Sequence, residues 1–139
     1  MTRRRILLVD DNPDDESLTQ RGLRQGLWDA EVVVAREGAD VLKMLGSMDP
    51  LPDLVLLDLK LPKFDGGEVL RQIRSDDRTR KLCVVIFTSS SEPRDIQRCY
   101  SLGCNSYVIK PVAYESYIDT IRQIGNYWLV LNQVPPEGS

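Results

Sequence analysis

Acidic, hydroxyl and basic residues directly follow four separate apolar runs of this chain. Asp10 and Asp11 follow residues 6–9, Asp58 follows 54–57, Thr88 follows 84–87, and Lys110 follows 107–109. If these runs are neighbouring parallel strands, the polar side chains gather at one edge of a single sheet. Three clustered carboxylates repel one another unless a cation lies nearby, and Mg²⁺ suits such a set because it uses few carboxylates. The pattern therefore fits a divalent cation and a phosphoryl group.

The same set supports one kind of group transfer. A carboxylate beside a bound metal can attack phosphorus and become an aspartyl phosphate, and Lys110 offers a positive charge that stabilises the transferring oxygens. The Thr88 hydroxyl offers a hydrogen bond to a phosphoryl oxygen. Each residue alone has a plainer interpretation: Asp10 and Asp11, for example, favour the positive end of a following helix. Their shared position after apolar runs indicates a common site.

Strand and helix signals alternate along the whole chain. Strands are predicted at 5–10, 32–35, 53–58, 82–88 and 105–110, and helices at 13–26, 38–48, 65–75, 93–102 and 114–128. The central runs are continuously apolar, which is typical of strands buried on both faces. Together they predict an α/β fold of the flavodoxin-like type, (βα)5, a doubly wound parallel five-stranded sheet in the order 2-1-3-4-5. That order places the first and third strands, and with them the three acids, side by side.

Length and composition fit one domain of ordinary size. The chain has 139 residues, of which 42% are hydrophobic. We expect one domain over 1–126 and an apolar extension with a loose tail over 127–139, without a separate output domain. The formal charge of −3 favours neither nucleic acid nor an anionic membrane as a partner. The chain has no histidine, which excludes His-based catalytic triads and most zinc sites.

Targeting signals are not visible in the sequence. The apolar stretch at 6–9 is too short for a signal peptide, and no run approaches the ~20 residues of a membrane span. The protein is therefore expected in the cytoplasm. Cys83, Cys99 and Cys104 form no C-x-x-C pair, and we expect them to be reduced, buried side chains.

Five segments make the chain resemble the receiver domain of bacterial response regulators, the CheY-like family. They read LLVDDN at 7–12, DLVLLDLKLP at 53–62, DG at 65–66, FTS at 87–89 and YVIKP at 107–111. The resemblance covers about residues 5–125. It implies a two-component signalling protein and not an enzyme. In such a protein Asp58 accepts a phosphoryl group from a phosphohistidine of a partner histidine kinase, and the protein assists its own phosphorylation and dephosphorylation.

The resemblance implies a Mg²⁺ site made of oxygen ligands. Asp11, Asp58 and the backbone carbonyl of Lys60 bind the ion directly, and Asp10 acts largely through water. The Lys60 side chain places a second cation beside Asp58, and we expect it to influence the lifetime of the phosphoryl group. The alternative is that Lys60 points into solvent.

The resemblance also implies how the phosphoryl group is bound and sensed. Lys110 pairs with the phosphoryl group, and Thr88 and Ser89 bind its oxygens. Tyr107 is the aromatic switch that turns inward as Thr88 moves toward the phosphate. Because phosphorylation replaces one carboxylate charge with about two charges, it would bias the output face formed by the fourth helix, the fifth strand and the fifth helix. Pro111 is expected to follow a cis peptide bond, which costs little before proline.

A narrower similarity links the chain to stand-alone regulators that serve bacterial phytochrome kinases. It is carried by NPDD at 12–15, LKLPK at 59–63 and YWL at 127–129. It implies a bacteriophytochrome as the partner kinase and a role in light signalling.

The end of the last predicted helix is apolar on more sides than one core requires. An extra apolar surface near a chain end predicts self-association as a symmetric homodimer. The candidate contact residues are Tyr117, Ile121, Ile124, Tyr127, Trp128, Leu129 and Leu131. The alternative is a tail folded back on its own domain.

Three other functions compete with phosphoryl acceptance. A flavodoxin-like FMN carrier needs a phosphate-binding loop after the first strand, where Asp10 and Asp11 would repel the phosphate. A phosphatase of the haloacid dehalogenase type also uses an aspartyl nucleophile but needs Asp-x-Asp and a cap domain. A phosphorylation-independent binding module would not need the full set of acids, Thr88 and Lys110.

Overall fold

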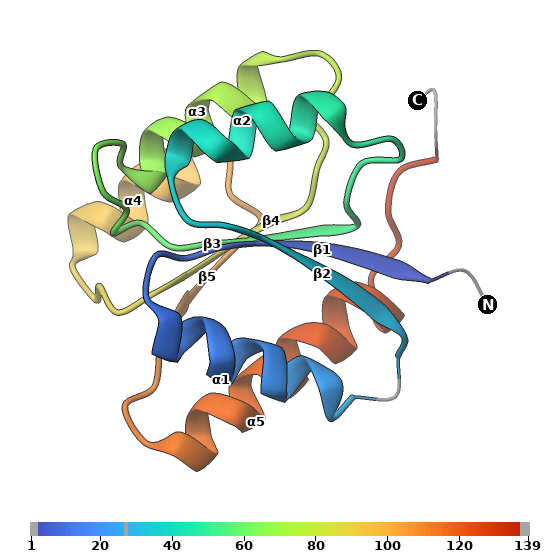
Figure 1. The fold of residues 1–139 in the computed structure, drawn as a ribbon. Coiled ribbons are helices and arrows are strands. Elements are labelled where there is room, and N and C mark those ends of the chain that lie inside the picture. The colour runs from blue at the N-terminus through green and yellow to red at the C-terminus, as the bar shows by residue number, and fades with distance from the viewer. Residues whose placement is uncertain (1–2, 27, 137–139) are drawn as a thin grey trace.

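Five parallel strands and the helices that connect them form the fold in the computed structural model, which describes residues 3–26 and 28–136 (Figure 1). The elements are β1 (Arg4–Val9), α1 (Pro13–Arg24), β2 (Ala30–Ala35), α2 (Gly38–Ser47), β3 (Leu54–Leu57), α3 (Gly66–Ser75), β4 (Val84–Thr88), α4 (Pro93–Ser101), β5 (Ser106–Ile109), α5 (Tyr114–Gly125) and the π-helix η1 (Asn126–Leu131). Within these ranges no helix is long and apolar enough to cross a membrane. The predicted alternation of strands and helices is confirmed.

The strands pair in parallel in the order β2-β1-β3-β4-β5, which confirms the predicted topology. Val9 pairs with Ala35 on one side and with Leu57 on the other, and Leu57 pairs with Ile86. Because the register stays in step, the strands end together along one side of the sheet, which we call the carboxyl edge. The opposite side is the amino edge. β1 and β3 are neighbours at the point where the strand order reverses, which is where open α/β sheets bind ligands.

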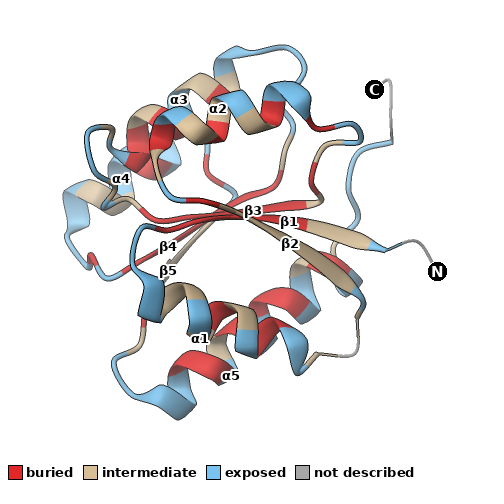
Figure 2. Ribbon diagram, in the orientation of Figure 1, coloured by how far each residue is buried: buried red, intermediate tan, exposed pale blue. Residues whose placement is uncertain are grey.

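Helices cover both faces of the sheet. Figure 1 shows α1 and α5 on one face and α2, α3 and α4 on the other. Each face has its own core, because strand side chains alternate between the two faces: Leu7 packs with Val41 and Ile73, and Leu8 packs with Leu23 and Ile121. The buried central strands stand out in Figure 2. This double burial explains why the strand sequences are continuously apolar.

Two loops at the carboxyl edge owe their shape to local sequence. The Asn12 side chain accepts hydrogen bonds from the N–H groups of Asp14 and Asp15, and Pro13 fills the first helical position, so that α1 begins directly after β1. Asp65 caps α3 by accepting from the N–H of Glu68. At Gly66 an added Cβ would collide with the Asp58 backbone oxygen, which explains a glycine where the loop after β3 turns into α3.

The C-terminal extension folds back along its own domain. α5 continues into η1, where Leu129 is buried in the same core as Tyr117. Beyond η1, the Asn132 amide donates to Cys83 Sγ at 3.7 Å, and the chain reaches the amino edge (Figure 1). Leu129 and Asn132 therefore contact the chain's own domain, whereas Tyr127, Val130 and Leu131 of the same extension are exposed. Residues 137–139 of the predicted loose tail lie outside the described residues.

Candidate functional site

The polar residues predicted from sequence lie at the carboxyl edge, where main-chain hydrogen bonds extend the sheet beyond the strands. The Asp58 N–H donates to the Val9 carbonyl at 3.0 Å, and the Lys110 N–H donates to the Thr88 carbonyl at 2.7 Å. Because the backbone of each residue is held this way, the side chains of Asp58 and Lys110 start from fixed positions. The carboxyl ends of β1, β3, β4 and β5 therefore lie together, as the sequence predicted.

Lys110 is the centre of the site. Its Nζ lies 2.8 Å from Asp10 Oδ2 and 2.9 Å from Asp58 Oδ2. A third bond of 2.8 Å runs to Oδ2 of Asp15 on α1. An ammonium has three donors, so all of them are used. Because the Lys110 side chain is only 6% exposed, the site is a buried positive charge surrounded by carboxylates.

Burial and hydrogen bonding have opposite effects on the pKa values of Lys110 and Asp10. Burial by itself would lower the pKa of Lys110, but the bonds from the three carboxylates outweigh it and raise that pKa above its ordinary value. Burial raises the pKa of Asp10, against the opposing bonds from Lys110 and the Asn12 N–H. Lys110 is therefore an ammonium at neutral pH. Its charge compensates the buried acids that would otherwise repel one another.

Asp58 is held by a hydrogen bond to each of its two carboxylate oxygens. Its Oδ2 accepts from Lys110, and its Oδ1 accepts from the Lys60 N–H at 3.1 Å. The Lys60 side chain is exposed, so its backbone takes part in the site while its ammonium faces solvent, as in the alternative considered for it. Each Asp58 oxygen retains acceptor capacity, and a carboxylate held this way can act as a nucleophile.

Thr88 contributes a buried hydroxyl to the site. It is 0% exposed, and its Oγ1 has no hydrogen-bond partner among the described residues. A buried unsatisfied hydroxyl costs a fold about 1–3 kcal/mol, so Thr88 Oγ1 is a candidate donor to a ligand oxygen. The adjacent Ser89 is exposed at the same loop.

Tyr107 is held facing the protein. Its hydroxyl donates to the Ser90 carbonyl at 2.8 Å, and its ring packs against the core beneath α2, α3 and α4. Burial raises the pKa of Tyr107, and the bond to Ser90 opposes that shift. Ser90 Oγ donates in turn to Asp95 of α4 at 2.6 Å, so that the loop after β4 joins the ring on β5 to α4.

Two of the residues predicted to act at the metal, Asp10 and Asp58, lie close together. Asp10 and Asp58 both face Lys110, and Asp11 is exposed beside them. Within the described ranges no group of three or more acidic, cysteine or histidine side chains is placed to hold a metal ion. Carboxylate and carbonyl oxygens are nevertheless the donors that hard divalent cations use, so the chemistry of the set fits such an ion.

Sequence reasoning missed Asp15. The signal was available, because Asp15 lies in the first turn of a helix that begins directly after the acids of β1. Which way a first-turn side chain points depends on the packing of that helix, and the sequence did not supply this.

The prediction of a cis bond before Pro111 is wrong. Among the described residues the cis peptide bond is Asp49–Pro50, and Lys110–Pro111 is not cis. The two isomers differ by only about 0.5–1 kcal/mol before proline, so local sequence does not decide between them.

The predicted dimer residues divide into two groups. Tyr117, Ile121, Ile124 and Leu129 are buried in the protein's own core, so their assignment to an intermolecular contact is wrong: the stripe they form on the helix is the one that faces the sheet. Tyr127 and Leu131 are exposed, and Trp128 is partly exposed.

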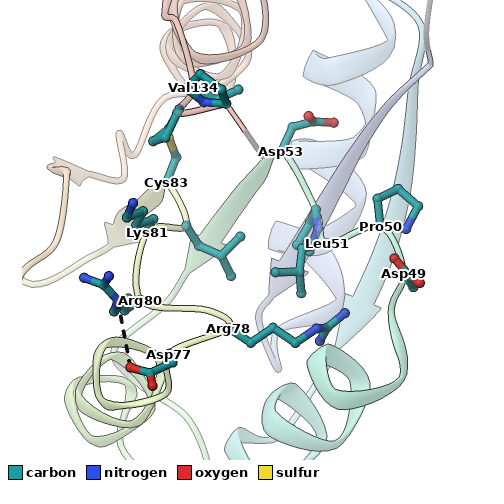
Figure 3. Close-up of a pocket in the computed structure, with 14 residues that line it drawn as sticks. Asp49, Pro50, Leu51, Asp53, Asp77, Arg78, Arg80, Lys81, Cys83 and Val134 are labelled. Carbon is teal, nitrogen blue, oxygen red and sulfur yellow. Dashed lines mark ion pairs between the residues drawn. The ribbon is translucent and has the colours of Figure 1, made fainter. Parts of the chain in front are cut away.

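A concave region lies at the amino edge, away from these residues. It is a hollow of about 600 Å³ between the loops that precede β3 and β4 and the C-terminal tail. Figure 3 shows Asp49, Asp53, Arg78 and Val134 on its walls. Arg78 donates to the Leu45 carbonyl, so its charge ties the loop before β4 to the end of α2. None of the residues predicted to do chemistry lines this hollow.

Comparisons with known proteins agree with the geometry. The family model described as response regulator receiver domain matches residues 6–122. The probable methanogenesis regulatory protein FilR2 of Methanothrix harundinacea is 40% identical, over 94% of this chain and 86% of that protein. Response regulator Rcp1 of Synechocystis is 33% identical, over 94% of this chain and 92% of Rcp1.

Solved structures are similar over nearly the full chain. The crystal structure of the phosphorylated cyanobacterial phytochrome response regulator RcpA superposes with a TM-score of 0.92 at 34% identity, covering 97% of this chain and 100% of RcpA. The Mn²⁺-bound form of Rcp1 gives a TM-score of 0.89 at 32% identity, covering 96% of this chain and 99% of Rcp1.

Proposed function

The chain belongs to the response regulator receiver domain family, and from that premise we propose that it receives a phosphoryl group on Asp58. The observation that carries this proposal is the position of Lys110 Nζ, 2.9 Å from Asp58 Oδ2 at a buried strand edge. The unpartnered hydroxyl of Thr88 belongs to the same edge. A nucleophile, a fixed cation and a spare donor are the components that phosphoryl transfer needs.

The transfer follows from these positions. An Asp58 oxygen attacks phosphorus as the bond from phosphorus to the donor's histidine nitrogen breaks, and the imidazole leaves with that electron pair. Lys110 donates to an oxygen of the transferring group, which stabilises its charge, and the Thr88 hydroxyl donates to another. Hydrolysis by water later returns the carboxylate, and the same Lys110 and Thr88 assist it.

A divalent cation completes the site in this proposal. Receiver domains bind divalent metal, and Mn²⁺ is bound in the Rcp1 structure. For this chain we propose Mg²⁺, held by Asp11, Asp58 and the Lys60 carbonyl, with Asp10 acting through water. When bound, the ion neutralises negative charge on the phosphoryl oxygens.

The response is proposed to run through the loop after β4. If Thr88 turns its hydroxyl toward a phosphoryl oxygen, the neighbouring Ser90 carbonyl that holds Tyr107 shifts with it. The affected surface is the face of α4, β5 and α5. It already exposes four large apolar side chains: Tyr100, Ile109, Val112 and Tyr114. Such a patch suits a protein partner.

The partner that supplies the phosphoryl group is proposed to be a sensor histidine kinase. This chain is a signalling protein, since that is the role of its family. Similarity to RcpA, a phytochrome response regulator, supports a bacteriophytochrome as the kinase. We place both in the cytoplasm, where reduced thiols such as the free Cys83, Cys99 and Cys104 are stable.

Self-association is proposed through the exposed side of the C-terminal extension. Tyr127 and Leu131 present apolar surface on η1, and Trp128 packs edge to face on Tyr127 at 4.9 Å. A symmetric homodimer would cover this surface. Tyr127→Ser with Leu131→Ser should convert a dimer into a monomer in light scattering without loss of folding, whereas a monomeric unsubstituted protein would contradict the dimer.

Acetyl phosphate with Mg²⁺ tests the main proposal. Intact-protein mass spectrometry should show one phosphoryl group per chain, labile in both strong acid and base as an acyl phosphate is, and absent in Asp58→Asn. Rapid release of many equivalents of phosphate, with no phosphorylated form accumulating, would instead indicate a phosphatase. Absence of any label under these conditions and with a histidine kinase would indicate a phosphorylation-independent binding module.

A further inference from the structure

Lys110 has a third carboxylate partner that comes from helix α1, whereas Asp10 and Asp58 directly follow strands. Asp15 Oδ2 lies 2.8 Å from Lys110 Nζ, and the Asp15 side chain is 27% exposed, against 7% for Asp58. We propose that Asp15 is a positioning residue, which holds the Lys110 ammonium over Asp58 and thereby sets how fast Asp58 gains and loses a phosphoryl group. This inference rests on the function proposed above.

The start of α1 frees the Asp15 carboxylate for this role. An acid at the third helical position often reaches back to the N–H of the cap residue. Here that N–H, on Asn12, already donates to Asp10 Oδ1 at 3.0 Å. The Asn12 side chain accepts in turn from the Asp15 N–H at 3.1 Å. The Asp15 backbone is therefore capped while its side chain points across the edge to Lys110.

A residue of α5, Tyr117, also contacts the backbone of Asp15. The Tyr117 hydroxyl donates to the Asp15 carbonyl at 3.3 Å, and it lies 2.9 Å from Thr19 Oγ1, also on α1. Tyr117 and Thr19 are both buried. The first turn of α1 is thus held by its own cap and by a helix that packs beside it. A carboxylate on such a support fixes its partner better than one on a free loop.

The three acceptors of Lys110 differ in what happens to them during the proposed cycle. Asp58 changes its chemical form, and Asp10 belongs to the proposed metal set. Asp15 alone among them keeps its charge and its partner throughout. A lysine side chain has several rotatable bonds, and a constant anchor keeps its ammonium in place while its bond to Asp58 passes to a phosphoryl oxygen. Such positioning contributes to rate without contact with the reacting atoms.

Asp15→Ala and Asp14→Ala form a matched pair for the test. Asp14 is the preceding residue of the same helical turn, it is exposed, and its removal changes the charge at the helix start equally. We expect phosphorylation by acetyl phosphate and decay of the acyl phosphate both to be slowed about 5- to 10-fold in Asp15→Ala. Asp14→Ala should match the unsubstituted protein, and Asp15→Glu should recover part of the rate.

A double-substitution cycle separates positioning from a general structural role. If Asp15 acts through Lys110, Asp15→Ala should have no further effect on either rate in a Lys110→Met background. Equal rates in Asp15→Ala and Asp14→Ala, or an undiminished effect in that background, would overturn the proposal. Thermal unfolding checks that Asp15→Ala is folded, and Asp15→Asn replaces it if it is not.

Failure of this inference is distinguishable from failure of the proposed function. If the unsubstituted protein takes a phosphoryl group that Asp58→Asn does not take, the proposed function stands. The Asp15 variants then decide the positioning role alone.

Discussion

Two long cations lie at opposite edges of the sheet, the buried Lys110 and the partly buried Arg74, and they differ in the groups that accept their hydrogen bonds. Lys110 at the carboxyl edge gives all its donors to the carboxylates of Asp10, Asp15 and Asp58. Arg74 at the end of α3 gives its donors to neutral oxygens near the amino edge: Gly103 O, Arg80 O, Leu82 O and Asn105 Oδ1. Lys110 thus uses all three of its donors and Arg74 uses four of its five, and the two cations differ in the kind of acceptor they bind.

The acceptors decide what each cation can do. Carbonyl and amide oxygens hold Arg74 in a fixed place between the loops that lead into β4 and β5, and nothing in that arrangement calls for a ligand. Carboxylates around Lys110 are acceptors that a phosphoryl oxygen can replace, because it too is anionic. The unpartnered Thr88 hydroxyl lies at that edge. We infer that Arg74 is structural and Lys110 functional.

The largest expected effect is that of Lys110→Met. It leaves the buried carboxylates of Asp10 and Asp58 without their cation, which should lower the free energy of unfolding by about 3 kcal/mol. Urea denaturation with and without Mg²⁺ measures it, and Mg²⁺ should restore part of the loss by neutralising the same acids. A variant as stable as the unsubstituted protein in the absence of metal would contradict the role of Lys110 as counter-ion.

Arg74→Met should lower stability by about 2 kcal/mol, because four acceptors at the starts of β4 and β5 lose a charged donor. Phosphorylation of Asp58 should keep its rate in this variant. Arg71→Met is the control, since Arg71 pairs with Glu68 on the exposed side of the same helix and its loss should leave stability unchanged. A large loss of phosphorylation in a folded Arg74→Met would contradict the assignment of a purely structural role to Arg74.

Alkaline pH should lower the stability of the fold through ionisation of Tyr117. Unlike the Thr88 hydroxyl, the Tyr117 hydroxyl has hydrogen-bond partners. Burial raises its pKa from 10.0 to about 12, opposed by the bond with Thr19. Its contribution is therefore complete below pH 10 and is lost as pH rises toward 12. The loss should reach about 2 kcal/mol. Chemical denaturation at pH 9 and pH 11.5 should show a smaller pH effect in Tyr117→Phe, and identical pH effects would exclude this cause.

The smallest expected effect on stability is that of Thr88→Val. It removes a hydroxyl that has no partner, so stability should stay the same or rise by about 1 kcal/mol. The response to phosphorylation should nevertheless be lost, seen as an absent change in the environment of Tyr107 by NMR after acetyl phosphate treatment. A clear drop in stability would mean that the hydroxyl has a structural partner after all.

The sequence anticipated the sheet and the strand-end residues well, because both depend on short-range pattern. Continuously apolar runs indicated strands buried on two faces. Because the strands are parallel, their carboxyl ends all lie at the same edge of the sheet. Asp58, Thr88 and Lys110 were located this way. The same reasoning failed for Tyr117 and Ile121, because periodicity shows that a helix has an apolar stripe but not whether the sheet or another molecule covers it.

What the sequence alone determined is therefore the order of the strands and the chemistry that follows each of them. Only the tertiary structure decided that Asp15 reaches Lys110 across 95 positions of the chain, that Pro111 does not follow a cis bond, and that Asn132 reaches Cys83. Apolar periodicity depends only on residues that are close in the sequence, whereas the direction of one side chain depends on how distant elements pack.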